Sequence, residues 1–495
     1  MLSQAGDPTI TGVDYDSRRI RPGFVFVAMQ GEASDGNRFI DQAIAAGATA
    51  VVTDSAEQIP RPGIGWALVP HGRRTLGRLS ANFYKRPAER LAMTGITGTN
   101  GKSTTSFLLE SILTAARRKS ALIGTIEYHV AGRVLPAPHT TPESLELNRL
   151  LAEALGHGAT EAVMEVSSHA LAQQRVFAIP FTTAIFTNLT RDHLDYHKTM
   201  EQYFAAKRVL FEGCGTEPPQ SAVINSDDEA GRELLKLSHK RSEVVLTYGL
   251  NAGDFHAEKV EITARGTRFD LAMPKETVPL FSPLIGQVNV YNVLAAAAGA
   301  YTRGCKAEEI ARGIDALARV PGRFERIDCG QPFTVVVDYA HTDDALRNLT
   351  MLAREFVQQA GARGRLLTVF GCGGDRDRAK RPLMGEAAGR GSDFVVLTSD
   401  NPRSEDPLAI INDAMVGLQR SGVQYKVEPE RRKAIALAIR EAGPGDIVLI
   451  AGKGHEQVQV TRDGALPFDD VEVARQVLAQ TGFDCDAVAG AGRKA

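Results

Sequence analysis

Cysteine is scarce in this sequence, and its distribution excludes two kinds of structural site. The chain has 5 cysteines, an odd number, and none stands in the C-x-x-C spacing that indicates zinc or a redox pair. They occupy positions 214, 305, 329, 372 and 485. We therefore expect reduced thiols in a cytosol and no disulfide framework.

Long apolar runs are also absent. No apolar stretch reaches the roughly 18 residues needed to cross a membrane. The first residues, MLSQAGDPTITGVDYDSRR, lack the basic and then apolar order of a signal peptide. A cytoplasmic protein without membrane insertion is expected.

The sequence has no excess of charge of either sign. Lys and Arg total 57 against 59 for Asp and Glu, a net charge of -2. Such a chain has no global positive field to hold nucleic acid or an anionic membrane, so nucleic acid is not an expected partner. Any anion site must be local.

The length and the order of the predicted elements indicate an α/β fold in three domains. A chain of 495 residues exceeds what one hydrophobic core normally organises. Strand and helix patterns alternate, pause at the polar, proline-containing stretch NFYKRPAER, and start again after RVPGRFERID. We predict a small N-terminal α/β domain at 1–88, a central parallel-sheet domain at 89–320, and a C-terminal Rossmann-like domain at 321–495. The strands of the last domain are predicted to end at Asp338, Phe370, Thr398 and Ile450.

A glycine-rich loop opens the central domain. The sequence GITGTNGKST at 95–104 follows a predicted strand and leads into a helical pattern. Glycines let backbone N–H groups face phosphate oxygens, Lys102 can neutralise the β- and γ-phosphates, and Ser103 can ligate magnesium. Ile96 stands where the strict Walker pattern has its first glycine, so this is a variant P-loop. It makes the central domain P-loop ATPase-like, with ATP or GTP as the implied ligand.

Later motifs narrow the function, because the P-loop alone leaves kinase, transport ATPase and ligase open. The motifs are VDYDSRR, MEVSSHALAQQRV, TNLTRDHLDYHKTMEQYFAAKRVLF, GQVNVYNVLAAAA, GCGGDRDRAKRPLMG, SDNPRSEDP and AGKGHEQ. In this order, and across essentially the whole chain, they resemble the Mur ligase family, and most closely its diaminopimelate-adding members. The resemblance implies an ATP- and Mg²⁺-dependent ligase of peptidoglycan precursor synthesis. Such an enzyme adds meso-diaminopimelate to UDP-N-acetylmuramoyl-L-alanyl-D-glutamate.

The resemblance also assigns a catalytic set. Lys102 and Ser103 correspond to phosphate and magnesium contacts, while Glu165 and His193 correspond to metal ligands that we expect at the ends of two sheet strands. Lys207 corresponds to a lysine that the family carries as a carbamate. A carbamate replaces a positive ammonium by an anion, which can join a magnesium cluster.

Substrate contacts follow from the same correspondence. The ATP set is Gly98, Thr99, Asn100, Gly101, Lys102, Ser103, Thr104, Asn289 and Asn292. The set for the UDP-muramoyl dipeptide is Tyr15, Ser17, Glu32, Ala33, Ser34, Thr140, Thr141, Ser167, Gln173 and Arg175.

The third domain is expected to select the amino acid. Diaminopimelate carries a distal carboxylate that lysine lacks, and a bidentate Arg403 with help from Asn401 is suited to it. Arg376 corresponds to a second carboxylate clamp, and Gly452 and Glu456 to groups that hold the distal amine. The complete set is Arg376, Asp400, Asn401, Pro402, Arg403, Gly452 and Glu456.

The implied reaction transfers the ATP γ-phosphoryl group to the D-glutamyl side-chain carboxylate, and the amine of diaminopimelate then attacks the acyl phosphate. The general base is left open between His341 and a carboxylate.

The expected partners are small-molecule substrates, and a monomer is expected. The alternatives are an L-lysine-adding ligase on the same precursor, a folylpolyglutamate synthase-like enzyme, and a P-loop switch or transport ATPase. The DNPR segment argues against the first two.

Overall fold

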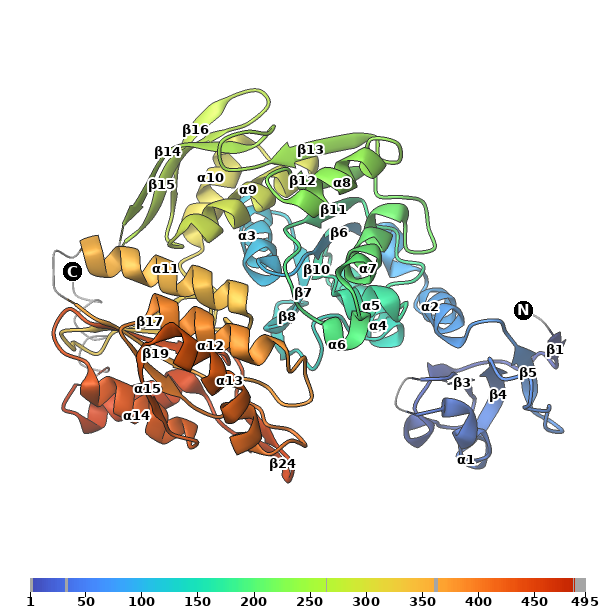
Figure 1. Ribbon diagram of the computed structural model, residues 1–495. Coiled ribbons are helices and arrows are strands. Elements are labelled where there is room, and N and C mark those ends of the chain that lie inside the picture. The colour runs from blue at the N-terminus through green and yellow to red at the C-terminus, as the bar shows by residue number, and fades with distance from the viewer. Residues whose placement is uncertain (1–2, 32–33, 264, 360–363, 484, 486–495) are drawn as a thin grey trace.

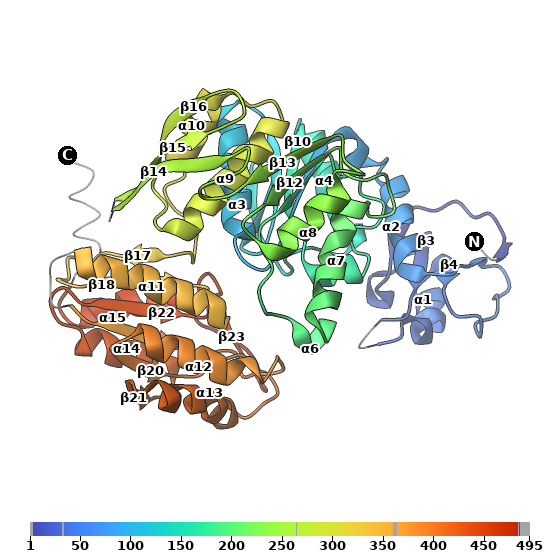
Figure 2. The ribbon, with the colours of Figure 1, turned by 45° about the horizontal axis from the view of Figure 1, so that its top comes forward.

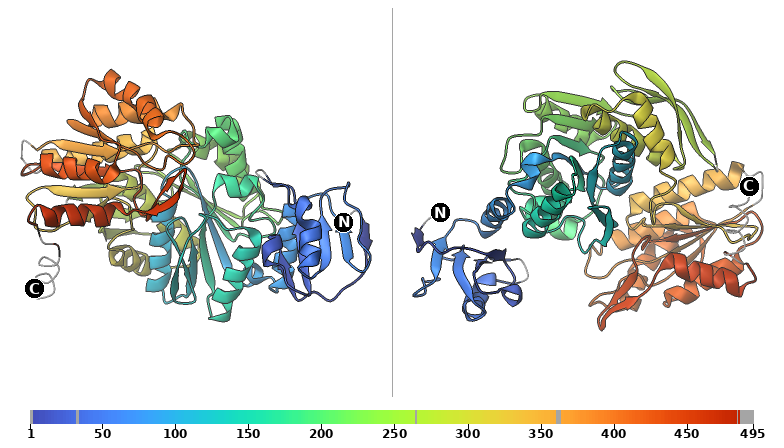
Figure 3. Two further views of the ribbon diagram at one scale, coloured as in Figure 1. Left: turned by 90° about the horizontal axis from the view of Figure 1, so that it is seen from below. Right: turned by 180° about the vertical axis from the view of Figure 1, so that it is seen from behind.

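The computed structural model describes residues 3–31, 34–263, 265–359, 364–483 and 485. Three main sheets follow one another along the chain, with the central sheet between the other two (Figures 1 and 3). This arrangement confirms the predicted α/β class. Among the described residues, no helix has both the length and the apolar character needed to span a bilayer.

The N-terminal sheet has five strands in the order β1-β5-β4-β3-β2, and β1 is the antiparallel edge. The valine-rich runs at 24–28 and 48–53 form two neighbouring strands that are largely buried. Its elements are β1 (Ser3–Ala5), β2 (Gly12–Asp14), β3 (Phe24–Ala28), α1 (Ile40–Ala45), β4 (Ala48–Thr53), β5 (Gly65–Leu68) and α2 (Gly72–Phe83). Helix α2 packs against α4 (Ser144–Gly156), a helix of the central unit.

The central sheet has eight strands in the order β13-β12-β11-β6-β10-β7-β8-β9. The strands from β13 to β7 are parallel, and β8 and β9 add an antiparallel edge. The strands are β6 (Ala92–Thr97), β7 (Ser120–Ile123), β8 (Glu127–Val130), β9 (Arg133–Pro136), β10 (Glu161–Glu165), β11 (Thr183–Phe186), β12 (Ser221–Asn225) and β13 (Val244–Tyr248). The helices are α3 (Lys102–Ala115), α5 (Ser168–Ala172), α6 (Leu194–His197), α7 (Met200–Glu212), α8 (Glu229–Ser238), α9 (Gln287–Thr302) and α10 (Ala307–Ala316).

Successive side chains of these strands point to opposite faces, which gives the sheet two cores. Leu122 and Val163 pack with α3, α9 and α10 on one face. Ala121 and Ala162 pack with α4 and α7 on the other. The sequence analysis did not anticipate the antiparallel sheet of β14 (His256–Thr263), β15 (Gly266–Ala272) and β16 (Thr277–Ser282). It lies beside α10 and contributes to the first of these cores (Figure 2).

The C-terminal sheet has six strands in the order β17-β18-β22-β19-β20-β21, and β17 is the antiparallel edge. Two predicted strand ends, Asp338 and Phe370, are confirmed, whereas the other two are wrong by one residue, since these strands end at Leu397 and Ala451. The six strands are β17 (Glu325–Ile327), β18 (Thr334–Asp338), β19 (Leu366–Phe370), β20 (Phe394–Leu397), β21 (Gln424–Val427) and β22 (Ile447–Ala451). A separate antiparallel pair follows, β23 (Val458–Thr461) and β24 (Gly464–Pro467). Helices α11 (Asp343–Gln359), α12 (Lys380–Gly391) and α13 (Pro407–Ser421) cover one face, and α14 (Arg431–Glu441) and α15 (Asp470–Gln480) cover the other.

The expectation that the cysteines are all reduced thiols is wrong, because a disulfide joins Cys329 and Cys485. The two residues are 156 positions apart in the sequence, so no local spacing signals the pairing. The other three cysteines, Cys214, Cys305 and Cys372, are free and buried, as expected of reduced thiols.

We propose 1–88, 89–320 and 321–495 as the domain boundaries, because each interval contains one of the three main sheets together with the helices that cover it.

Candidate active site

The glycine-rich loop connects β6 to α3 in a conformation that requires glycine. Gly98 and Gly101 have φ values of 152° and 85°, a region that residues with a Cβ rarely adopt. A Cβ on Gly101 would lie 2.4 Å from Oδ1 of Asn292. The loop therefore holds its tight turn and stays close to α9 only with glycine at both positions.

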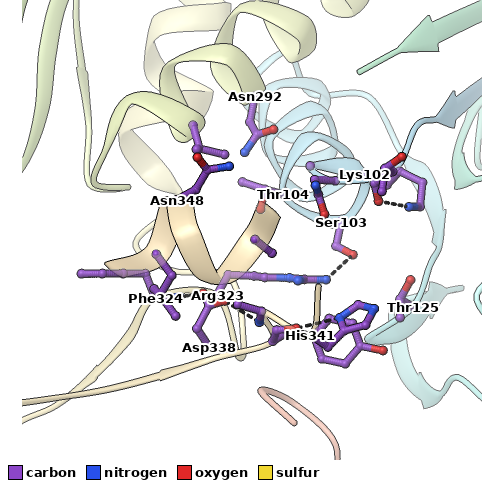
Figure 4. Close-up of a pocket in the computed structure, with 18 of the residues that line it drawn as sticks. Lys102, Ser103, Thr104, Thr125, Asn292, Arg323, Phe324, Asp338, His341 and Asn348 are labelled. Atoms are coloured by element: carbon purple, nitrogen blue, oxygen red, sulfur yellow. Dashed lines mark hydrogen bonds between the residues drawn. The ribbon is translucent and has the colours of Figure 1, made fainter. Parts of the chain in front are cut away.

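Lys102 begins α3 and folds back over this loop. Its Nζ donates hydrogen bonds to the carbonyl oxygens of Gly98 (3.0 Å) and Thr99 (2.8 Å). Burial lowers the pKa of Lys102, and the nearby Arg323 guanidinium lowers it further. Ser103 Oγ accepts a hydrogen bond from Arg323 Nη2 at 3.3 Å (Figure 4).

A pocket of about 250 Å³ lies between the central and C-terminal units. The central unit contributes the P-loop and the carboxyl end of β10, and the C-terminal unit contributes the carboxyl end of β18. This is where open parallel sheets usually bind ligands. The predicted residues that line it are Thr99, Asn100, Gly101, Lys102, Ser103, Thr104, Thr140, Glu165, Ser167, His193, Asn289 and Asn292. Figure 4 shows Asn292 and Thr104 on one side of this pocket and Asp338 and His341 on the other.

Glu165 is the last residue of β10 and is fully buried. Its two carboxylate oxygens accept hydrogen bonds from Thr125, one from N and one from Oγ1, each at 2.8 Å. His193 is not at a strand end, which corrects that expectation, because β11 ends at Phe186 and the chain continues through a loop first. His193 instead caps α6 with φ 55°, and burial lowers its pKa to about 2. Its ring is therefore neutral, and its Nε2 lies 3.4 Å from Oδ2 of Asp192.

Lys207 lies behind the P-loop and does not line the pocket. It is 1% exposed on α7, and its Nζ donates to the carbonyl oxygen of Gly98 at 2.8 Å. The same nitrogen lies 4.3 Å from the ring centre of Tyr203. Burial lowers the pKa of Lys207 well below its ordinary value, and the positive charge of Lys102 adds to this effect.

The two asparagines predicted to contact nucleotide lie together at the start of α9. Asn292 Nδ2 donates to Asn289 Oδ1 at 3.0 Å, and both residues line the pocket.

Contacts between the two units close the rim of the pocket. Asp192 Oδ1 lies 3.4 Å from Nζ of Lys380 on α12, and both side chains are buried. Asp192 Oδ2 lies 3.8 Å from Nε2 of His341. Asn100 Nδ2 donates to Asp344 Oδ2 at 3.1 Å. These pairs join the P-loop and the His193 loop to the C-terminal unit.

The predicted dipeptide contacts fall into two groups. Thr141 Oγ1 donates to the carbonyl oxygen of Glu165 and accepts from Ser167 N, while Arg175 Nη1 donates to the carbonyl oxygen of Thr141. Gln173 accepts two hydrogen bonds from Arg175, at 3.0 and 2.7 Å. These residues, together with Thr140, surround the end of β10.

The second group belongs to the N-terminal unit. Tyr15 Oη donates to Glu146 on α4 at 3.2 Å, and Ser17 Oγ donates to Gln42. The carbonyl oxygen of Ser34 accepts from Gly31 N. Two predicted residues, Glu32 and Ala33, lie outside the described residues.

The predicted amino-acid contacts gather at the carboxyl ends of β20 and β22. Arg403 has φ 52°, and its Nη1 donates to the carbonyl oxygens of Gly374 (2.8 Å) and Asn401 (3.4 Å). Burial lowers the pKa of Arg403, and the adjacent Arg376 guanidinium adds to the effect. Within the described part of the chain, neither guanidinium forms an ion pair with a carboxylate. Two neighbouring cations without an anion are suited to bind one from outside.

The two residues predicted to hold the distal amine, Gly452 and Glu456, belong to the same group of predicted contacts. Gly452 has φ 119°, and a Cβ there would lie 2.5 Å from Oδ2 of Asp400. Glu456 Oε2 accepts from Asn401 Nδ2 at 2.7 Å. Pro402 connects Asn401 to Arg403, and its carbonyl oxygen lies 1.9 Å from where a Cβ on Gly374 would stand. The DNPR turn therefore packs directly against the GCGGD loop.

Several pocket residues were missed by the sequence analysis. Arg323 reaches the P-loop from the segment that joins the two units, and Asp338 ends β18 with its carboxylate accepting from the backbone N of Phe324 and Ala340. Asp192 was also missed, and so was Lys380, which contacts Asp192 without lining the pocket. All four stand within quoted motifs or at predicted strand ends, but only the relative placement of the two units shows which of their polar residues meet.

Three family profiles match consecutive parts of the chain. Residues 9–84 match the catalytic domain of the Mur ligase family, 96–300 the Mur ligase middle domain, and 322–454 the glutamate ligase domain of Mur ligases. The P-loop pocket and the order of the three units place this chain in the class of multidomain ligases. The chain belongs to the Mur ligase family.

Relatives and solved structures agree with this assignment. The UDP-N-acetylmuramoyl-L-alanyl-D-glutamate--2,6-diaminopimelate ligase of Solibacter usitatus is 55% identical over 475 residues, covering 96% of this chain and 94% of the relative. The ligase of the same name from Geobacillus thermodenitrificans is 42% identical, covering 97% of each chain. A solved structure of a ligase of this name has a TM-score of 0.67 at 34% identity and covers 95% of each chain. MurF ligase from Thermotoga maritima, solved with ADP, shares the fold with a TM-score of 0.67 at 19% identity, covering 96% of this chain and 99% of that one.

Proposed function

We propose that this chain uses ATP to join meso-diaminopimelate to the D-glutamyl side-chain carboxylate of UDP-N-acetylmuramoyl-L-alanyl-D-glutamate. The observation that carries this proposal is the pocket in which the P-loop and the end of β10 face the end of β18. A second cluster, around Arg403, lies on the same C-terminal sheet. Relatives up to 55% identical over nearly the full length have this activity in their names.

The P-loop is suited to hold the triphosphate of ATP. Lys102 already donates to two loop carbonyls, and its ammonium can turn to phosphate oxygens when a nucleotide enters. Arg323 approaches Ser103 from the C-terminal unit, so a second cation faces the same place. Two positive groups in a buried pocket stabilise the charge that develops on the transferred phosphoryl group.

Magnesium fits the donors of this pocket. Ser103, Glu165 and His193 supply a hydroxyl, a carboxylate and a neutral imidazole, and Mg²⁺ usually takes few protein ligands beside phosphate and water. No cluster of three or more His, Cys, Asp or Glu side chains that could hold a metal occurs among the described residues. When bound, the ion would neutralise charge on the β- and γ-phosphates.

Lys207 is the proposed carbamate. Only a neutral amine attacks CO₂, and burial lowers the pKa of Lys207, which favours its neutral form. The resulting anion would lie beside Gly98 and would place a negative charge near Lys102.

The reaction proceeds in two steps at the junction of the two units. The D-glutamyl carboxylate attacks the γ-phosphorus of ATP, which gives an acyl phosphate and ADP. The amine of diaminopimelate then attacks the acyl carbon, and the tetrahedral intermediate releases phosphate to leave an amide. Thr141, Ser167 and Arg175, at the end of β10, are proposed to orient the dipeptide for the first step. His341 is the proposed base for the amine, since burial lowers its pKa and keeps it neutral in this pocket.

The amino-acid cluster favours diaminopimelate over lysine. Arg403 and Arg376 present neighbouring guanidinium groups, and a distal carboxylate would satisfy both. Lysine would leave the partly buried positive charge of Arg403 without a partner.

The test is a product assay by mass spectrometry with purified protein, ATP, Mg²⁺, the UDP-muramoyl dipeptide and one amino acid at a time. We expect the nucleotide to gain the mass of diaminopimelate, with L-lysine at least about 100-fold slower. ATP hydrolysis without an extended nucleotide would refute the ligase, and preference for lysine would refute the substrate. The purified protein should elute as a monomer of 53.3 kDa. In cell extracts, the protein should fractionate with the cytoplasm, where ATP is available.

A further inference from the structure

Lys453 is completely buried beneath the amino-acid cluster, directly after Gly452 in the loop that follows β22. Its Nζ donates to Asn401 Oδ1 and to Glu456 Oε2, each at 3.0 Å. Asp400 Oδ1 lies 3.9 Å from the same nitrogen. One lysine therefore contacts three residues of the proposed amino-acid site.

These contacts fix the orientation of two side chains. Asn401 Oδ1 accepts from both Lys453 and the backbone N of Val460 (2.9 Å), so its Nδ2 must face Glu456, to which it donates at 2.7 Å. Glu456 Oε2 accepts from Lys453 and from Asn401. Its Oε1 makes no hydrogen bond with any residue that the structure describes, and the Glu456 side chain keeps 28% of its surface exposed.

The charges around Lys453 point to a cation as the ligand. Without Lys453, the carboxylates of Asp400 and Glu456 would be two like charges in a partly buried site with no cation between them. With Lys453 between them, one net negative charge remains, and it faces solvent at Glu456 Oε1. An ammonium group of the substrate would complete this arrangement.

We propose that Lys453 is a positioning residue that sets Glu456 and Asn401 for the distal ammonium of the incoming amino acid. It acts through these two side chains and does not touch the reacting atoms. The inference rests on the proposed function, because it names the recognition of one group of diaminopimelate.

The test compares two amino acids that differ only at the group concerned. L-2-Aminopimelate keeps the reacting amine and the distal carboxylate of diaminopimelate but lacks the distal amine. Lys453→Met is expected to lower kcat/KM for diaminopimelate about 10- to 100-fold, because it removes a charged donor from a buried acceptor. For 2-aminopimelate, used as a substrate or as a competitive inhibitor, the change should stay within about threefold. The KM values for ATP and for the UDP-muramoyl dipeptide should not change.

Two further variants separate positioning from a general loss of structure. Glu456→Gln should show the same selective loss of kcat/KM for diaminopimelate. The double variant, with both Lys453→Met and Glu456→Gln, should lose no more than either single variant, because both substitutions weaken the same contact with the distal ammonium. Lys433→Met is the matched control, because Lys433 is 66% exposed on α14 and pairs with the exposed Glu430. Should Lys453→Met not fold, Lys453→Gln is tested by the same comparison of diaminopimelate with 2-aminopimelate.

Equal losses for the two amino acids, or an unchanged kcat/KM for diaminopimelate, would overturn the role of Lys453. Failure of the wild-type protein to couple diaminopimelate would instead overturn the proposed function. The two failures are thus distinguished by the wild-type measurement.

Discussion

At the scale of single residues, two proposed site residues have a backbone conformation that is unfavourable for them. His193 and Arg403 have φ values of 55° and 52°, in the left-handed region that non-glycine residues rarely occupy. Such strain persists only where surrounding contacts impose it, and it concentrates at functional sites. In Arg403 these contacts are the carbonyl oxygens of Gly374 and Asn401.

Arg403 should determine the preference for diaminopimelate. Arg403→Ala removes the paired donors for the distal carboxylate, so kcat/KM for diaminopimelate should fall about 100- to 1,000-fold. The value for L-lysine, which has no such carboxylate, should change less than about tenfold. Arg462→Ala, in the exposed turn between β23 and β24, is the control. Equal losses toward both amino acids would refute the selectivity argument.

Lys207 should carry CO₂ in the active protein. In ¹³C-bicarbonate, NMR should detect a carbamate signal in the wild type that is absent in Lys207→Arg, since arginine cannot form it. Activity of this variant should fall at least about 100-fold, the effect of losing one charge-stabilising group in a closed site. Lys240→Arg, on the surface, should retain both the signal and the activity. A fully active Lys207→Arg without the signal would contradict the proposal.

From the sequence it was possible to name residues of the site, but not the burial and contacts of each side chain. Lys102, Ser103 and Glu165 were assigned from motifs and do share one pocket. The complete burial of Lys453 and the pairing of Cys329 with Cys485 had no sequence signal, because both depend on chain segments that meet only in the folded domain.

At the scale of elements, the loops that follow parallel strands bring the chemistry together. The P-loop follows β6, Glu165 ends β10, and Asp338 ends β18, so three strands of two sheets deliver polar groups to one pocket. The family resemblance placed Glu165 at a strand end, and strand alternation in the sequence predicted the end of β18 at Asp338. It did not predict the loop that carries His193, because loop geometry depends on tertiary contacts such as the pair between Asp192 and Lys380.

The histidines of these loops make stability depend on pH. Burial lowers the pKa of His197, at the end of α6, to about 4 and that of His455 to about 3. In the unfolded chain both would titrate near 6.5. The unfolded state therefore binds more protons between pH 6.5 and 4, and the free energy of unfolding should fall as the pH is lowered through this window.

Urea unfolding at each half pH unit measures this effect. His197→Asn should flatten the decline between pH 6.5 and 4, whereas His239→Asn, at the exposed end of α8, should leave it unchanged. A wild-type stability that does not change over this range would contradict the assigned burial of both rings.

At the scale of the whole molecule, catalysis depends on two units that meet over one pocket. Asn100 contacts Asp344, Asp192 contacts Lys380, and Arg323 reaches Ser103. These contacts join the unit proposed to hold ATP to the unit proposed to hold diaminopimelate, so the two substrates can meet. The order of three α/β units was predictable from the sequence, because each has its own series of strands and helices. Their relative placement was not predictable, because it rests on single polar pairs far apart in the sequence.

The most direct test of this account follows an oxygen atom. The UDP-muramoyl dipeptide is prepared with ¹⁸O in the D-glutamyl side-chain carboxylate, and the phosphate released during turnover with diaminopimelate is analysed by mass spectrometry. If the carboxylate attacks ATP and the amine then displaces phosphate, each phosphate carries one ¹⁸O for every amide formed. Unlabelled phosphate accompanying amide formation, or phosphate released without any amide, would contradict the claim that the pocket activates this carboxylate for capture by an amine.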